Sequence, residues 1–289
     1  MNALKDTSHS PNFIDLHYHA NPDAFVRCHG AIDAGKLYAA ANGRVVLKNH
    51  LGCTAAQAWE ARSQGFPVSG SLVLNEIAGG VDFRVVERSL CMRGDEPGRF
   101  IVHFPTVTGR KHTSTLARNV SHPLLVSKPI KPLRVTTDAG RLTPQALDIL
   151  KMACDYPLVI STGHADAREV RALVDESVRL GVPRLMLNQP ANPLTDLKAA
   201  ELLEIATAPN VFIEQTALTY LLGYQQEDDF REVLSTVPNV VYSSDLGQTS
   251  QMDVNDWLEQ SQRWFDTFEL DNARRVQVTL ANPQKMLEL

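Results

Sequence analysis

Few cysteines, no long apolar run and no excess of basic residues limit what this 289-residue chain can be. The four cysteines, Cys28, Cys53, Cys91 and Cys154, form no C-x-x-C pair, which argues against a disulfide framework or a zinc ribbon. No apolar segment reaches the roughly 20 residues of a membrane-spanning helix. With a net charge of -5, the chain offers no basic footprint for nucleic acid. We therefore expect neither a membrane nor a nucleic-acid partner.

Signatures of targeting and of two common enzyme classes are also missing. Residues 1–11 are polar and lack the apolar core of a signal peptide, so we expect an N-terminal tail and a cytoplasmic protein. No G-x-G-x-x-G follows the first apolar segment, which weakens a dinucleotide-binding fold. No G-x-S-x-G is present, and neither Cys28 nor Cys53 ends a predicted strand. Serine and cysteine nucleophiles are thus disfavoured.

What the chain does contain is an alternation of strand-like and helix-like segments from end to end. Helical patterns such as 54–64, 166–180 and 197–206 separate short apolar runs that suit strands buried on both faces. We predict eight strands, at 13–17, 44–48, 68–74, 100–104, 158–161, 184–187, 211–214 and 240–243. Eight such units in under 300 residues predict an α/β fold with a single (β/α)8 TIM barrel over residues 1–289. An open doubly wound sheet is the alternative.

One long irregular segment interrupts the alternation. Residues 106–142 follow the fourth predicted strand and contain three prolines, Pro123, Pro129 and Pro132. Long loops after barrel strands often act as lids or determine specificity. Residues 106–142 are therefore a candidate lid, and Arg110 and His112 within them are candidate substrate-binding residues.

Potential metal ligands gather at the ends of the predicted strands, where barrel enzymes place their sites. His17 and His19 are two residues apart at the end of the first strand, so both should point to one face and suit a divalent cation. Later strand ends carry further polar residues: Lys48, His50, His103, His164, Asn188, Glu214 and Asp245. A divalent ion with a carboxylate beside it can activate a water, because the ion lowers the water's pKa and the carboxylate accepts its proton.

At this point the chain resembles the amidohydrolase superfamily of metal-dependent barrel hydrolases. The resemblance is carried by four segments: Phe13 to His19, Ser161 to His164, Ser243 to Asp245, and the closing Asn282 to Leu287. It implies that His17, His19, His164 and Asp245 bind the metal, zinc first and manganese or iron next, as one or two ions. It also implies that Asp245 shuttles protons.

The chain departs from that pattern at two strands. Many members place a second His after strand six, where this chain has Asn188 and Gln189. Members with two metals often use a carboxylated Lys or a Glu on strand four, which here offers His103. A dinuclear centre of the usual kind is therefore not predicted, and His103 and Asn188 become candidate substrate contacts.

Strand two supplies residues whose roles stay open. Lys48 and His50 share one face, so His50 is a candidate additional ligand. Lys48 is either a carboxylated catalytic bridge, an anchor for a substrate carboxylate, or structural. Glu214 could complete the metal shell, orient a ligand His, or pair with a cation. Residue spacing alone does not decide between these roles for Lys48, His50 and Glu214.

The sequence as a whole predicts a metal-dependent hydrolase that cleaves an amide, lactone or related ester bond of a small molecule. A metal-dependent decarboxylase on the same scaffold is the runner-up, and a non-catalytic binding protein on a retired barrel is the third hypothesis. Because barrels of this size often pair, a homodimer or higher homo-oligomer is an open expectation.

Overall fold

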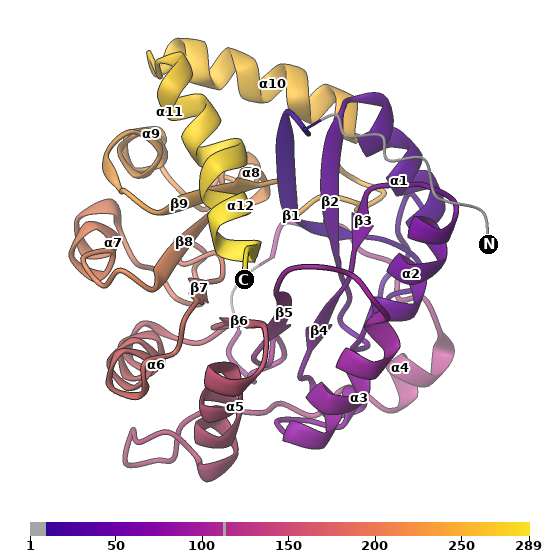
Figure 1. Cartoon of the computed structure of the whole chain (residues 1–289), viewed down its shortest axis with the longest axis vertical. Coiled ribbons are helices and arrows are strands. Elements are labelled where there is room, and N and C mark those ends of the chain that lie inside the picture. Colours follow the sequence, from indigo (N-terminus) through magenta and orange to yellow (C-terminus); the bar gives the residue numbers. More distant parts are fainter. Residues whose placement is uncertain (1–9, 112–113) are drawn as a thin grey trace.

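The computed structural model describes residues 10–111 and 114–289, and it has the TIM-barrel fold predicted from the sequence. Strands form an inner ring and most helices surround them (Figure 1). The strands are β1 Phe13–His19, β2 Gly43–Lys48, β3 Val68–Ser69, β4 Ser71–Val73, β5 Phe100–His103, β6 Leu158–Ser161, β7 Leu185–Leu187, β8 Val211–Thr216 and β9 Val240–Ser243. Because only Gly70 separates β3 from β4, these segments coincide with the eight predicted strands.

All of the strand pairs are parallel, in a sheet ordered β1-β2-β3 and a sheet ordered β4 to β9. Gly70 lies where these sheets meet, and a Cβ there would come within 2.8 Å of the Ala55 backbone. At the other junction, the amide of Asp245 donates to the His17 carbonyl at 2.8 Å. The chain after β9 is thereby bonded directly to the end of β1.

The helices include the three that the sequence patterns indicated, at α2, α6 and α7. The bounds of all the described helices are α1 Ala31–Ala40, α2 Ala55–Ser63, η1 Glu76–Ala78, α3 Phe83–Arg93, α4 Pro123–Ser127, α5 Pro144–Asp155, α6 Ala167–Leu180, α7 Ala199–Ile205, α8 Ala217–Leu221, α9 Glu227–Thr236, α10 Val254–Thr267, α11 Asn272–Val276, η2 Gln277–Ala281 and α12 Asn282–Leu287. Helix α6 begins with a capping box between Asp166 and Glu169 and ends at Gly181. In the described part of the chain, no helix is long and apolar enough to span a membrane.

Two apolar clusters hold the barrel together. The larger one joins the outer faces of the strands to the surrounding helices. The smaller one fills the barrel interior with residues from the strands and from α12: Ile14, Leu16, Val46, Ile101, Val159, Met186, Phe212, Val241 and Met286. Helix α12 crosses the middle of the ring in Figure 1, and Asn282 at its start donates to the carbonyls of Pro238 and Val240. One end of the barrel is thus closed by apolar packing, which leaves the other end for polar residues.

Candidate active site

A local irregularity in β1 turns two histidines into the barrel. Ile14 and Leu16 belong to the interior cluster, so strict alternation would send Tyr18 inward next. The register between β1 and β2 shifts between Asp15 and Tyr18, which inserts one extra residue opposite β2. Tyr18 therefore packs in the outer cluster, and His17 and His19 face a cavity at the end of the barrel.

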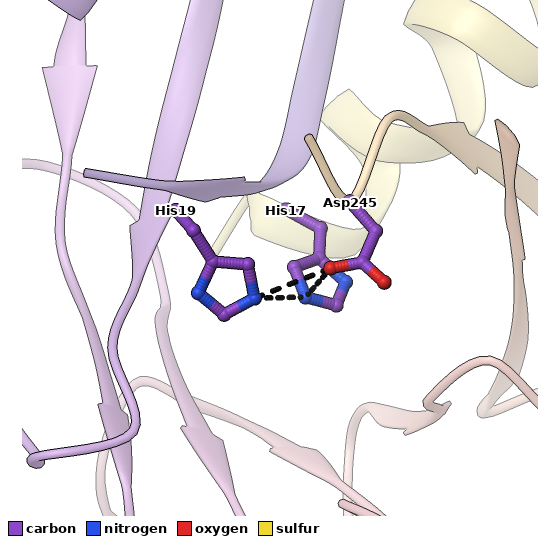
Figure 2. Close-up of side chains that lie close together, drawn as sticks. All are labelled: His17, His19 and Asp245. Atoms are coloured by element: carbon purple, nitrogen blue, oxygen red, sulfur yellow. Dashed lines mark hydrogen bonds and ion pairs between the residues drawn. The ribbon is translucent and has the colours of Figure 1, made fainter. Parts of the chain in front are cut away.

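Three ligand atoms converge at the floor of this cavity. The Nε2 atoms of His17 and His19 lie 3.0 and 3.2 Å from Oδ1 of Asp245, and 3.3 Å from each other. Figure 2 shows the two rings side by side on β1, with the carboxylate reaching them from the loop after β9. All three side chains are buried. Two imidazoles and a carboxylate at one point form a donor set suited to a divalent cation.

A second carboxylate lies on the far side of each ring. Nδ1 of His17 lies 3.0 Å from Oε1 of Glu214, and Nδ1 of His19 lies 3.3 Å from Oδ2 of Asp23. A neutral imidazole with its Nδ1 proton towards a carboxylate presents a lone pair at Nε2. Two such lone pairs and a carboxylate oxygen then face one another. Their mutual repulsion is removed when a cation or a proton binds between them.

The ionisation of these groups agrees with a site that attracts positive charge. Burial would lower the pKa of His17, but the Asp245 and Glu214 carboxylates raise it above its ordinary value. Burial lowers the pKa of His19 to about 4, and the Arg27 charge acts in the same direction. Burial would raise the pKa of Asp245, yet the two histidines hold it well below its ordinary range. At neutral pH His19 is thus uncharged and Asp245 ionised, the states that bind metals.

Backbone geometry and a side-chain amide orient Asp245. The residue has a left-handed backbone, with φ at 55°, which few non-glycine residues adopt. Gln189 donates from Nε2 to Oδ2 of Asp245, which leaves Oδ1 directed at the histidines. Gly247, two residues later, passes so close to the His19 carbonyl that a Cβ would lie 1.9 Å from its oxygen. The loop after β9 is therefore shaped around His17 and His19.

A second cluster of potential ligands shares His19. His50 Nδ1 lies 3.1 Å from Oδ2 of Asp23, and the His50 ring stacks on His19 with centroids 4.8 Å apart. The same carboxylate oxygen also accepts from Nε and Nη2 of Arg27, at 2.8 and 2.5 Å. Because the guanidinium already supplies the positive charge, this cluster is an ion pair flanked by two histidines.

Lys48 lies in the floor of the cavity with 2% of its surface exposed. Its Nζ donates to Oδ1 of Asn188 at 2.6 Å, so the two candidates from strands two and six are in direct contact. Burial lowers the pKa of the Lys48 ammonium, while the charges of Glu214 and Asp245 act in the opposite direction.

The other two candidate histidines lie outside the converging group. His103 is buried, and its Nδ1 lies 2.7 Å from the Ser161 hydroxyl. His164 is half-buried and lines the cavity, but its ring nitrogens belong to neither close ligand cluster. Burial, with the Lys48 charge adding to it, lowers the pKa of both rings well below the ordinary value. Both are neutral at pH 7.

The segment 106–142 supplies one wall of the cavity, whose volume is about 400 Å³. Arg110 lines it but is engaged, with Nη2 at 2.7 Å from Asp166 and 2.6 Å from Glu169. Arg110 also donates to the His164 carbonyl and so braces the loop after β6. His112 lies outside the described residues.

Three residues near the site escaped sequence reasoning. Asp23 and Arg118 lie several residues beyond the ends of β1 and β5, so a search restricted to strand ends does not find them. Gln189 follows the candidate Asn188 at the end of the sixth predicted strand, where many members of the resembled superfamily have a histidine and this chain has none. The sequence suggested no role for it. Its amide donates to the carboxylate of Asp245, a contact that no spacing rule predicts.

Comparisons with known proteins agree with the fold. Residues 12–214 match the model of a family described as "Family of unknown function (DUF6282)". None of the curated proteins matches the sequence. An amidohydrolase from Burkholderia multivorans aligns over 95% of this chain and 98% of its own, with 14% identity and a TM-score of 0.50. An uncharacterized TIM-barrel protein from Bordetella bronchiseptica covers the same shares, with 12% identity and a TM-score of 0.53. At such identities the likeness establishes the barrel fold, in agreement with the fold predicted from the sequence.

Proposed function

We propose that this chain, which belongs to the DUF6282 family of unknown function, is a metal-dependent hydrolase of small molecules. The bond cleaved is an amide, a lactone or a related ester. The TIM-barrel fold hosts many reactions, so the proposal depends on the site and not on the fold.

The observation that carries the proposal is the convergence of His17 Nε2, His19 Nε2 and Asp245 Oδ1 within 3.3 Å of one another. Glu214 and Asp23 lie at the opposite ring nitrogens, where each carboxylate can face an Nδ1 proton while Nε2 binds a cation. These three residues would hold a divalent cation, zinc by preference for this donor set. When bound, the ion would polarise a scissile carbonyl and make a nearby water more acidic.

The chain's own groups account for the proton transfers. Asp245 is ionised, buried and open to the cavity, so it can accept a proton from the attacking water and return it to the leaving group. The Gln189 amide binds Oδ2 and keeps the carboxylate oriented. Glu214 itself accepts from the Ser243 hydroxyl at 2.8 Å and from the backbone N–H of Gln189 at 3.1 Å, which supports a role in orienting His17.

The cavity walls favour a small polar substrate. Neutral imidazoles of His164 and His50 line it, as does Thr106. A volume of about 400 Å³ suits a molecule of metabolite size.

Metal content tests the proposal. Elemental mass spectrometry of the purified protein, after reconstitution with zinc, should give one equivalent per chain. The His17→Ala, His19→Ala double variant should lose it while remaining folded by circular dichroism. The matched control is His29→Ala, which removes a partly exposed histidine that pairs with Asp253 outside the converging group. A wild-type protein that takes up no zinc, manganese or iron would overturn the proposal in favour of a non-catalytic binding protein.

A decarboxylase is the second candidate, favoured by the buried Lys48 ammonium in the cavity floor. A cation there could anchor a substrate carboxylate beside the metal ligands. Screening the zinc-loaded protein against carboxylated and uncarboxylated substrates separates the two reactions, because only decarboxylation releases carbon dioxide.

A further inference from the structure

The charges at the cavity floor do not balance once a divalent cation is bound. Asp245 and Glu214 face the two ligand histidines, and together their charges neutralise such an ion. Asp23 is already neutralised by Arg27. This accounting rests on the proposed function, and it leaves the ammonium of Lys48 without a counter-charge.

The contacts of Lys48 support the same conclusion. An ammonium group has three protons to donate, and the hydrogen bond found for it goes to the neutral amide oxygen of Asn188. Within residues 10–111 and 114–289, no carboxylate lies within 4.0 Å of its Nζ. A buried cation with a neutral partner is costly unless a ligand supplies the anion.

A second cation lines the same cavity from the segment 106–142. The guanidinium of Arg118 lies 5.0 Å from the ring centroid of Phe25, another cavity residue. For the part of the chain described, no carboxylate forms an ion pair with it. Arg110 and Arg27 also line the cavity, but both are engaged with carboxylates of the protein. Lys111 lines it too, from an exposed position.

The backbone around Arg118 is fixed from both sides. The carbonyl of Ala117 accepts from the Ser250 hydroxyl at 3.1 Å. The carbonyl of Asn119 accepts from the Val26 amide at 2.9 Å. These bonds connect the segment to the loops after β9 and β1, so the backbone that carries Arg118 is fixed beside the cavity that His17, His19 and Asp245 also line.

We propose that Lys48 and Arg118 form an oxyanion-binding subsite, and that the substrate is an anionic small molecule that carries a carboxylate or a phosphate. Arginine and lysine beside a neutral amide are the groups that recognise such oxyanions. The substrate's anion supplies the charge that the floor lacks, and its scissile bond lies towards His17, His19 and Asp245.

Titration calorimetry tests the subsite with malonate and inorganic phosphate as probes. Each is titrated into zinc-loaded wild type, Lys48→Gln and Arg118→Gln, with zinc content measured on the same samples. We expect at least one probe to bind the wild type, and each variant to weaken that binding by about tenfold, as loss of a charged hydrogen bond does. The probe that binds more tightly distinguishes a carboxylate from a phosphate substrate. The exposed Lys151→Gln is the matched control and should bind as wild type does.

The outcomes separate this inference from the proposed function. If both variants retain zinc and bind the anion as the wild type does, the subsite is wrong and the metal site is unaffected. Zinc alone would then bind the probe. No binding of either probe to zinc-loaded wild type would also overturn it. A wild type without zinc would remove the proposed function and the charge argument together. If Lys48→Gln does not fold, Arg118→Gln decides, because its side chain lies at an exposed position.

Discussion

Two clusters of the same residue types share His19, yet they differ in what holds them together. In the cluster of His17, His19 and Asp245, lone pairs and a carboxylate converge with no cationic side chain in ion-pair contact among the described residues. In the cluster of His19, Asp23 and His50, Arg27 binds the carboxylate directly. Ligand type and proximity alone therefore do not define a metal site. What matters is whether a cationic side chain of the protein already neutralises the carboxylate of the cluster.

The largest expected effect comes from neutralising the carboxylate of the first cluster. Asp245→Asn should lower kcat by about 10²–10⁴-fold on any substrate that the zinc-loaded enzyme turns over, because it removes the general base. The measurement is kcat at saturating zinc, with zinc content determined in parallel. Asp253→Asn, in the same loop region but paired with His29, is the control and should retain activity. Full turnover by Asp245→Asn would remove the assigned role.

Removing the resident cation of the second cluster should mainly affect stability. Arg27→Met leaves the buried Asp23 carboxylate without its guanidinium, which costs about 3–5 kcal/mol when a buried pair is broken from one side. Chemical denaturation of the zinc-free protein measures the free energy of unfolding. Arg263→Met, which breaks an exposed pair with Glu259, should change it by less than about 1 kcal/mol. Equal effects of the two substitutions would contradict the contrast between the clusters.

The zinc affinity of a Glu214 variant tests whether this carboxylate orients a histidine of the first cluster or binds the ion itself. Glu214→Gln keeps the shape of the side chain but weakens its hold on the Nδ1 proton of His17, so zinc should bind about 10–100-fold more weakly. Competition with a chelator of known affinity provides the measurement. The matched control is Glu169→Gln, a buried carboxylate that pairs with Arg110 beyond the cavity wall. If Glu214 were a direct ligand, its loss would abolish stoichiometric zinc rather than weaken it.

The sequence predicted the barrel well, because its signals are local. Runs such as Leu158–Ser161 and Val240–Ser243 are apolar up to a final serine, and their bounds match β6 and β9. The i, i+2 spacing of His17 and His19 correctly indicated one face. It could not show that an extra residue in β1 is needed to turn that face inward, since a register shift depends on pairing with β2.

The remainder of the site depends on contacts between distant segments. Gln189 meets Asp245 and Arg118 meets Phe25 only when the barrel brings these loops together. Asp23 lies six residues beyond His17 in a loop, where an acidic residue ordinarily needs no explanation. Charge compensation within the fold, which separates the two clusters, is likewise invisible until Arg27 and Asp23 are seen in contact.

The smallest expected effect is the most discriminating between the clusters. His50 belongs only to the second one, so His50→Asn should leave zinc stoichiometry at one. It should change the zinc affinity by less than about threefold, which is well below the loss typical of replacing a metal ligand or a residue that orients one. Its Nδ1 faces a carboxylate that Arg27 and two backbone amides already satisfy, and that carboxylate therefore keeps its hold on His19. His17→Asn is the paired substitution in the first cluster and should abolish stoichiometric zinc. Loss of zinc from His50→Asn as complete as that from His17→Asn would mean that the ion lies between the clusters, with His19 as their common ligand.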